Sequence, residues 1–165
     1  MTYFVLFIGF VIFLRLLELY IANQNEKWAR SAGAIEYGKN HYPYIVLLHT
    51  MFIVSMFAEF MIRGGKFNWM ILLIFLVLML FKVWVIASLG KYWNTKILRV
   101  PGSKLIKKGP YKYLKHPNYI VVVCEIFLIP MVFNLYLTAI IFSFLNGIML
   151  AVRIKEEEKA WALNL

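Results

Sequence analysis

Two short polar stretches hold the side chains that could do chemistry in an otherwise apolar chain. The first, GPYKYLKHPNY at residues 109–119, contains a histidine and three tyrosines, and the second is RIKEEEKAW at 153–161. In the second stretch Arg153, Glu157 and Trp161 are spaced by four, so a helix would place them on one face. Such a face could hold a carboxylate at a membrane surface to bind a cation or an amine. Taken alone, it is more typical of an exposed helix with internal ion pairs.

The histidine of the first stretch stands directly before a proline. A residue before proline favours an extended backbone, and proline suits the first turn of a helix, so a helix is predicted to begin at or just after Pro117. His116 and Tyr119 would then lie at the mouth of an apolar helix. The alternative is a membrane-interface belt, to which Tyr111 and Tyr113 would also belong.

The elements that carry these stretches are expected to be membrane helices. Of the 165 residues, 62% are hydrophobic, whereas soluble domains contain roughly 45–50%. About 20 apolar residues cross the hydrocarbon, and such runs lie at 3–22, 43–62 and 68–89. The run 119–152 is interpreted as a helical hairpin of two short spans that turns near 131–135. We therefore predict an all-α, polytopic membrane protein with about five transmembrane helices, a cytoplasmic loop and a C-terminal helix.

We expect one membrane domain over 1–165, with three spans in 1–89 and the functional loop, hairpin and C-terminal helix in 90–165. Five spans would place the connector 23–42, the loop 90–118 and the C-terminus on one side. That side carries fourteen of the 18 lysines and arginines. Because positive charge favours the cytoplasmic side, the loop 90–118 and the C-terminus are predicted to be cytoplasmic. The same flanking pattern argues against nucleic acid as the reason for the net charge of +10.

Together the two stretches resemble the isoprenylcysteine carboxyl methyltransferase family. The family pattern is G-x-Y with (R/K)HPxY, then two short spans, then R-(I/V)-x-x-E-E-x-x-L. The matching residues are Gly109, Tyr111, His116, Pro117, Tyr119, Arg153, Glu157 and Glu158. At three positions the residue differs from the one usual in the family: Lys115 stands where arginine is usual, Val121 where glycine is usual and Trp161 where leucine is usual. The resemblance covers about 105–163 and is closest to the small bacterial members.

The resemblance implies an integral membrane methyltransferase of the bacterial cell membrane that uses S-adenosyl-L-methionine. The cofactor-binding residues that it implies are Tyr111, His116, Tyr119, Arg153, Glu157 and Glu158. The acceptor would be a lipophilic small molecule or a lipidated molecule with a carboxylate or an acidic hydroxyl, taken from the bilayer. Two alternatives stay open, a phospholipid-amine N-methyltransferase and a non-enzymatic membrane scaffold or transporter subunit. The sequence does not determine the oligomeric state.

A hydroxyl acceptor would benefit from a base, whereas a carboxylate needs none. Glu125, about two turns into the predicted fourth span, is the favoured candidate, and His41 and His49 are alternatives. The competing interpretation makes Glu125 a structural partner of Lys82 or Arg15. No metal site is expected, because three histidines, one cysteine and no aspartate provide no usual ligand spacing.

Three further ionisable residues within spans receive structural interpretations. Arg15 and Glu18 are three residues apart, so they share a helix face and are expected to pair. Glu59 lies near the end of its span and is expected to reach the outer interface.

Overall fold

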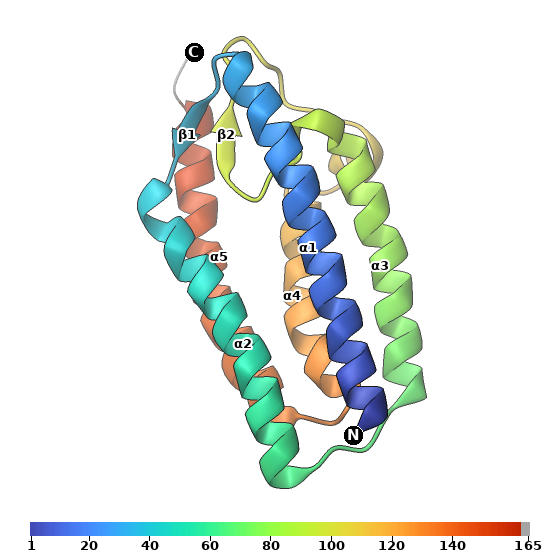
Figure 1. Ribbon diagram of the computed structural model, residues 1–165. Helices are drawn as coiled ribbons and strands as arrows, with labels where there is room; N and C mark the ends of the chain where they lie inside the picture. Colours follow the sequence, from blue (N-terminus) through green and yellow to red (C-terminus); the bar gives the residue numbers. More distant parts are fainter. Residues whose placement is uncertain (163–165) are drawn as a thin grey trace.

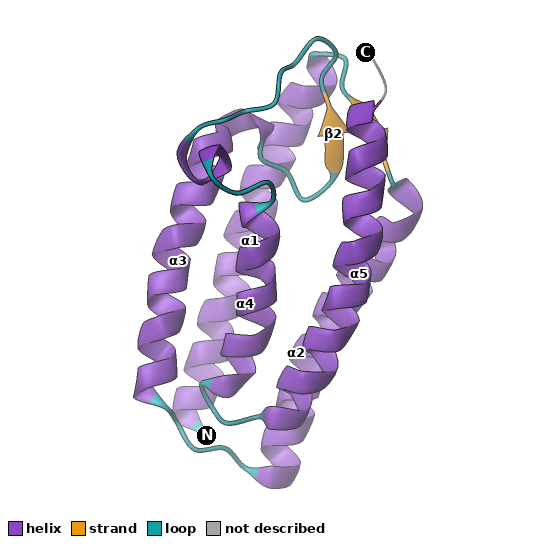
Figure 2. Ribbon diagram, turned by 180° about the vertical axis from the view of Figure 1, so that it is seen from behind, coloured by secondary structure: helices purple, strands orange, loops and turns teal. Residues whose placement is uncertain are grey.

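The computed structural model describes residues 1–162, which form an elongated bundle of five α-helices (Figure 1). The helices are α1 (Thr2–Ser31), α2 (Tyr42–Arg63), α3 (Trp69–Leu89), α4 (Pro117–Met131) and α5 (Tyr136–Ala162). In both ribbon views α2 and α5 lie side by side, and α1, α3 and α4 form a second group that faces them (Figures 1 and 2). The predicted all-α fold is confirmed. The last three residues of the predicted segment 90–165 lie outside the described part of the chain.

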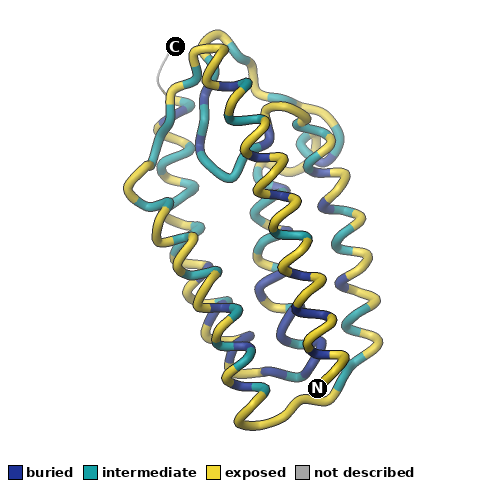
Figure 3. Tube along the Cα trace, in the orientation of Figure 1, coloured by how far each residue is buried: buried dark blue, intermediate teal, exposed yellow. Residues whose placement is uncertain are grey.

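Exposed positions follow the helices along the bundle (Figure 3), and large apolar side chains occupy many of them. Ile62 is 83% exposed and Leu80 is 72% exposed. Contiguous apolar surface of this extent marks a face that meets lipid rather than water. Four helices, α1, α2, α3 and α5, are long and apolar enough to cross a bilayer. The chain is therefore an integral membrane protein.

The helix α4 is shorter than the others. It has 15 residues and is about 22 Å long, whereas the hydrocarbon core is about 30 Å thick. It begins at Pro117, as the proline predicts. It ends in a turn where the backbone N–H of Leu135 donates to the carbonyl of Pro130 at 3.0 Å, with Asn134 at a φ of 56°. The hairpin and its turn are confirmed, but α4 alone is too short to span.

Phenylalanine side chains close the end of the bundle that holds the N-terminus. Phe4 stacks on Phe60 with 4.0 Å between ring centroids. Phe57 and Phe133 meet the ring of Phe4 edge-on, both at 5.2 Å. This aromatic core ties α1 and α2 to the turn between α4 and α5, and leaves the opposite end of the bundle to the polar segments.

Glu59, expected at the outer interface, lies near the end of α2 but is not exposed there. It is buried, and its carboxylate accepts hydrogen bonds from the backbone N–H groups of Leu137 at 3.1 Å and Thr138 at 2.7 Å. The first N–H groups of a helix have no partner within the helix, and a carboxylate satisfies them. Glu59 thus caps α5 from α2.

The opposite end is built from the two long connectors and the end of α5. Strands β1 (Ile35–Tyr37) and β2 (Ile97–Arg99) pair antiparallel, with Ile35 opposite Arg99. The sequence analysis predicted no strand here, because three residues are too few to display an alternation of apolar and polar positions. Short 3-10 turns, η1 (Lys39–His41), η2 (Gly90–Tyr92) and η3 (Gly109–Lys112), complete this end.

The helix α1 extends beyond its predicted span as far as Ser31 and holds the loop that follows α3. The side-chain amide of Asn25 donates to the carbonyl of Trp93 at 2.7 Å. Lys96 Nζ lies 2.8 Å from Oε1 of Glu26. The loop 90–118 is therefore fixed to α1, so that its polar side chains have defined positions.

Candidate active site

The two polar stretches of the sequence meet at this end of the bundle. Tyr119, in the first turn of α4, donates from its hydroxyl to Oε2 of Glu157 on α5 at 2.5 Å. Arg153 Nε donates to the same hydroxyl at 3.1 Å. The ring of His116 stacks on that of Tyr119 with centroids 5.1 Å apart, and its Nδ1 lies 3.6 Å from Glu157 Oε2. Residues far apart in the sequence thus form one contiguous polar cluster.

A cavity of about 170 Å³ lies between the loop 90–118 and the end of α5. We call it the loop–tail cavity. Five of the residues predicted to bind a cofactor line it, namely Tyr111, His116, Tyr119, Arg153 and Glu157.

Two polar atoms in the wall of the loop–tail cavity have no hydrogen-bond partner within residues 1–162, the hydroxyl of Tyr111 and Nε2 of His116. Both atoms are buried, and buried polar atoms are nearly always paired. Burial raises the pKa of the Tyr111 phenol, and the negative charge of Glu157 raises it further, so the hydroxyl remains a donor at neutral pH. A small molecule with complementary polar atoms would satisfy both groups.

Strand β2 contributes a residue to this cavity that the sequence analysis did not single out. Arg99 is buried, donates to the carbonyl oxygen of Ala160, and holds its guanidinium 5.1 Å from the ring centroid of Trp161. In the sequence Arg99 is one of eight basic residues between 91 and 119. It is the one arginine among them, which is a signal that the sequence analysis did not use, and the pairing of β1 with β2 sets its place.

Glu158 does not line the loop–tail cavity. It lies on an exposed side of α5, where Nζ of Lys115 donates to Oε1 at 2.6 Å. Of the adjacent glutamates, only Glu157 faces the cavity. The sequence analysis gave both glutamates the same role, but successive residues on a helix point about 100° apart.

Gly109 allows the loop to approach α3 closely. Its φ is +55°, in the left-handed region, and a Cβ there would clash with Oγ of Ser88. Glycine avoids both the steric cost of this conformation and the clash. The turn η3 can therefore pack against α3 and present Tyr111 to the cavity.

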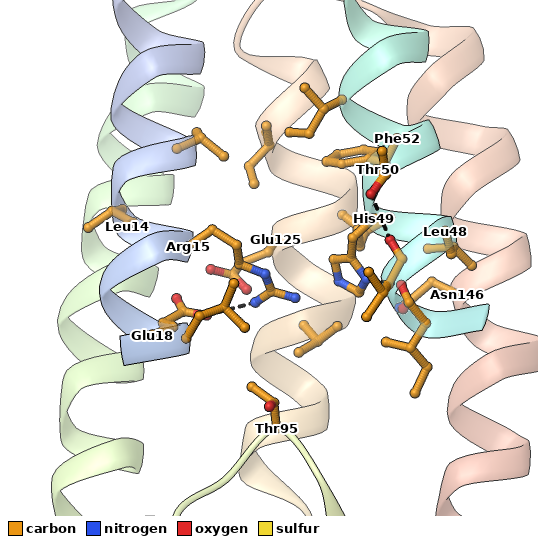
Figure 4. A pocket seen from close by; sticks show the side chains of 18 of the residues that line it. Leu14, Arg15, Glu18, Leu48, His49, Thr50, Phe52, Thr95, Glu125 and Asn146 are labelled. Atoms are coloured by element: carbon orange, nitrogen blue, oxygen red, sulfur yellow. Dashed lines mark hydrogen bonds and ion pairs between the residues drawn. The ribbon is translucent and has the colours of Figure 1, made fainter. Parts of the chain in front are cut away.

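A second cavity of about 440 Å³ lies between the two groups of helices (Figure 4). We call it the bundle cavity. Its walls are mainly apolar side chains, including Val11, Phe52 and Ile126. Small-molecule pockets usually measure about 300–1,000 Å³, so the bundle cavity lies in that range and the loop–tail cavity alone does not. The two cavities share a wall of five residues, Trp93, Asn94, Asn118, Tyr119 and Arg153.

Ionisable side chains form a layer in the wall of the bundle cavity. Nζ of Lys82 lies 2.6 Å from Oε1 of Glu125 and also contacts Glu18. Arg15 donates to Oε2 of Glu18 at 2.7 Å. Two cations and two carboxylates thus neutralise one another, which buried charges require. The expected pairing of Arg15 with Glu18 and the alternative pairing of Glu125 with Lys82 are both present.

The candidate bases differ in position. Glu125 lines the bundle cavity, but its Oε1 contacts Lys82. His41 lines neither of these two cavities. His49 lines the bundle cavity, with Nδ1 at 2.8 Å from the carbonyl oxygen of Ile45. Val121, which stands where the family pattern has glycine, is fully buried among core residues and lines neither cavity.

The fold defines an integral membrane protein in which a cavity lined by the polar motif residues adjoins a mainly apolar one. Residues 69–163 match the isoprenylcysteine carboxyl methyltransferase (ICMT) family, a segment that contains both polar stretches. The chain belongs to this family of methyltransferases, as its motifs indicate.

Two bacterial relatives cover nearly the whole chain. YpbQ of Bacillus subtilis, described as uncharacterized, is 46% identical over 158 residues, which are 94% of each chain. An uncharacterized protein of Haemophilus influenzae is 30% identical over 156 residues, 91% of this chain and 90% of that one. No solved structure matches the chain.

Proposed function

We propose that the protein is an integral membrane O-methyltransferase that uses S-adenosyl-L-methionine. Its acceptor is a lipophilic molecule with a carboxylate or an acidic hydroxyl. The observation that carries the proposal is the wall that the two cavities share. Five of the family's motif residues line the loop–tail cavity, which adjoins the apolar bundle cavity across Tyr119 and Arg153. Methyl transfer requires little more than two reactants held in line and in contact, and adjoining cavities suit that requirement.

The residues of the loop–tail cavity fit the polar groups of S-adenosyl-L-methionine, which carries an ammonium, a carboxylate and a nucleoside. The carboxylate of Glu157 suits the ammonium or the ribose hydroxyls, and the guanidinium of Arg153 suits the carboxylate. Tyr111 and Nε2 of His116, which have no partner within residues 1–162, suit the polar atoms of the nucleoside. The ring of Trp161 provides a face for stacking or for a cation. The bound cofactor supplies an electrophilic methyl group on a sulfonium.

The size of the loop–tail cavity supports an arrangement that uses both cavities. At about 170 Å³ it is smaller than the usual range for small-molecule pockets, about 300–1,000 Å³. We therefore propose that the cofactor site includes the shared wall and the adjoining end of the bundle cavity. Tyr119 and Arg153 line both spaces, and so would lie between the cofactor and the acceptor.

The bundle cavity suits a lipophilic acceptor because most of its lining is apolar and the outer faces of its helices meet lipid. An anionic oxygen that approaches a sulfonium loses charge in the transition state, so poorly hydrated surroundings favour the reaction. We also propose that the polar end of the bundle faces the cytoplasm. The connector 23–42, the loop 90–118 and the end of α5 lie together at that end (Figure 1), and they carry fourteen of the 18 lysines and arginines.

Calorimetric titration of the purified protein with S-adenosylhomocysteine tests the cofactor site. We expect binding to the wild type, weaker binding to Glu157→Gln and unchanged binding to Glu156→Gln. Glu156 is the matched control, because it bonds to Lys159 and lines neither cavity. Failure of the wild type to bind at millimolar ligand would overturn the proposal.

Transfer of labelled methyl groups to defined acceptors tests the reaction. Palmitic acid supplies a carboxylate, 3-pentadecylphenol an acidic hydroxyl and phosphatidylethanolamine an amine. Methylation of one or both oxygen acids supports the proposal. Methylation of the amine alone would instead indicate an N-methyltransferase. If the protein neither binds S-adenosylhomocysteine nor methylates any of the three acceptors, a scaffold or transporter subunit is favoured.

A further inference from the structure

We infer that His49 and Asn146 hold the reacting oxygen of the acceptor in the bundle cavity, and that Nε2 of His49 receives its proton during methyl transfer. This inference rests on the proposed function, and it assigns the proton to His49 rather than to Glu125. The ligand it requires is an oxygen acid, either a carboxylic acid or an acidic hydroxyl, on a lipophilic molecule.

The hydrogen bond of His49 determines which nitrogen can act as a base. Nδ1 lies 2.8 Å from the carbonyl oxygen of Ile45. A carbonyl oxygen can only accept a hydrogen bond, so Nδ1 carries the proton and Nε2 holds the lone pair. The ring projects from α2 at the bundle cavity (Figure 4). His49 thus offers an oriented base nitrogen within an apolar space.

Asn146 provides an independent sign of a ligand in the same cavity. It is 3% exposed and lines the bundle cavity from α5, the helix that packs against α2. Its Nδ2 is buried and has no hydrogen-bond partner within residues 1–162. An amide N–H in this situation needs an oxygen acceptor. An acceptor oxygen held by the amide of Asn146 could place its proton near Nε2 of His49.

The charged groups around His49 explain why it, rather than Glu125, is the base. The charged groups that line the cavity are Arg15 and Glu18 from α1, Lys82 from α3, Glu125 from α4 and Arg153 from α5. Glu125 neutralises Lys82 at 2.6 Å, and a proton on Glu125 would leave that buried cation with one partner fewer. His49 does not take part in this ion pair, so its protonation leaves Lys82 with both carboxylate partners.

Arg15 complements this arrangement as a source of positive charge for the acceptor oxygen. Its Nη1 bonds to Glu18, and Figure 4 shows its guanidinium extending toward the imidazole of His49. An oxygen that gives up its proton becomes anionic, and a nearby cation stabilises it. Arg15 is therefore a positioning residue of the same cluster.

The place of the cluster along the helices agrees with a reacting group in the bundle cavity. His49 is seven residues beyond Tyr42 on α2, and Asn146 is seven residues before Arg153 on α5, about 10 Å along each helix. Tyr42 and Arg153 both line the end of the bundle cavity nearest the loop–tail cavity. The cluster therefore lies about two helical turns inside the apolar space.

The reaction balances with His49 as the only proton acceptor. The acceptor oxygen forms a bond to the methyl carbon, and the carbon–sulfur bond breaks with its electron pair remaining on sulfur. The proton of the acceptor passes to Nε2 of His49 and is later released to water. A carboxylic acid that is already ionised would use only the hydrogen bond from Asn146 and the charge of Arg15.

Chemical modification tests the cluster without any turnover. Diethyl pyrocarbonate acylates imidazole nitrogen, and mass spectrometry can report His49 and His41 separately in the same wild-type protein. At about ten times its Kd, 3-pentadecylphenol or palmitic acid should slow the modification of His49 about tenfold and leave that of His41 unchanged. An unreactive His49, or protection by neither probe, would overturn the inference.

Substitutions then test the role of each residue. His49→Gln should lower kcat for 3-pentadecylphenol by about 100-fold or more. Affinity for S-adenosylhomocysteine should not change, which also shows that the variant is folded. Asn146→Leu should raise KM for both oxygen acids. His41→Gln is the matched control and should change none of these quantities.

The outcomes separate this inference from the proposed function. An unchanged kcat in His49→Gln overturns the inference even if the wild type binds S-adenosylhomocysteine and methylates both probes. Loss for 3-pentadecylphenol but not for palmitic acid supports a base used by hydroxyl acceptors. If the wild type fails to bind S-adenosylhomocysteine while the probes still protect His49, the proposed function fails and the acceptor cluster stands.

Discussion

The hydroxyl of Tyr119 accepts a hydrogen bond from Nε of Arg153 at 3.1 Å, and both residues line the loop–tail cavity and the bundle cavity. The same hydroxyl donates to Glu157. One phenol therefore fixes the start of α4 to α5 at the boundary of the two cavities. Any change in the distance between these helices would alter both cavities together.

Removal of that hydroxyl should weaken cofactor binding. Tyr119→Phe leaves Glu157 and Arg153 without their common partner, and hydrogen bonds to charged groups contribute about 1.5–3 kcal/mol. We expect affinity for S-adenosylhomocysteine to fall about tenfold or more, measured by calorimetry. Tyr113→Phe is the control, because Tyr113 is 77% exposed and lines neither cavity. Equal affinities in the two variants would contradict the role given to Tyr119.

Adjacent glutamates should behave differently. Glu157→Gln removes a carboxylate from the cavity wall and should reduce affinity for S-adenosylhomocysteine. Glu158→Gln removes only an exposed pairing with Lys115, which contributes little, and should leave affinity unchanged. Calorimetric titration of both variants under one condition checks this, and a larger effect from Glu158 would reverse our assignment.

The ion network in the bundle cavity should contribute to stability. Lys82→Met leaves Glu18 and Glu125 without their shared cation, and loss of one partner of a buried pair costs about 3–5 kcal/mol. We expect a clear fall in Tm in detergent. Lys66→Met, at an exposed turn, should leave Tm unchanged.

The same network predicts how Glu125 responds to neutralisation. If His49 is the base, Glu125→Gln should lower Tm through the weakened contact with Lys82 and retain most of kcat for 3-pentadecylphenol. Thermal unfolding and initial rates on the same preparation check both quantities. If Glu125→Gln is folded but loses as much kcat as we expect for His49→Gln, Glu125 is the base instead of His49.

A methyl group at Gly109 should displace the turn that presents Tyr111. Gly109→Ala combines strain at a positive φ with a clash against Ser88, and such strain alone costs of order 1–3 kcal/mol. Gly102→Ala is the matched control, because its φ is also positive but its Cβ would meet nothing within 4 Å. We expect Gly109→Ala to lose more Tm than Gly102→Ala and to bind S-adenosylhomocysteine more weakly.

The proposed orientation can be tested in intact cells. In a Cys124→Ser background, Lys66→Cys and Lys107→Cys place single thiols at exposed positions. The first lies in the connector between α2 and α3 and the second in the loop 90–118, and these segments lie at opposite ends of the bundle (Figure 1). A membrane-impermeant maleimide should label the first variant in intact cells and the second only after lysis. The reverse pattern would place the loop 90–118 outside the cell.

The sequence by itself determined the features that depend on local chemistry. Runs of apolar residues predict membrane helices wherever they occur, and Pro117 predicts the start of α4 because its ring restricts the backbone nearby. The hairpin and the face shared by Arg153, Glu157 and Trp161 follow from length and helical spacing in the same way. The two motifs also identified the family without reference to three-dimensional structure.

Only the tertiary structure decided which of several equivalent side chains meet in space. The pairing of β1 with β2 places Arg99, one of eight basic residues, in the wall of the loop–tail cavity. Glu59 caps α5 because α2 lies beside the first turn of α5. His49 and Asn146, ordinary positions on separate apolar helices, come to line one cavity. Such contacts join residues tens of positions apart, and no local preference of the backbone encodes them.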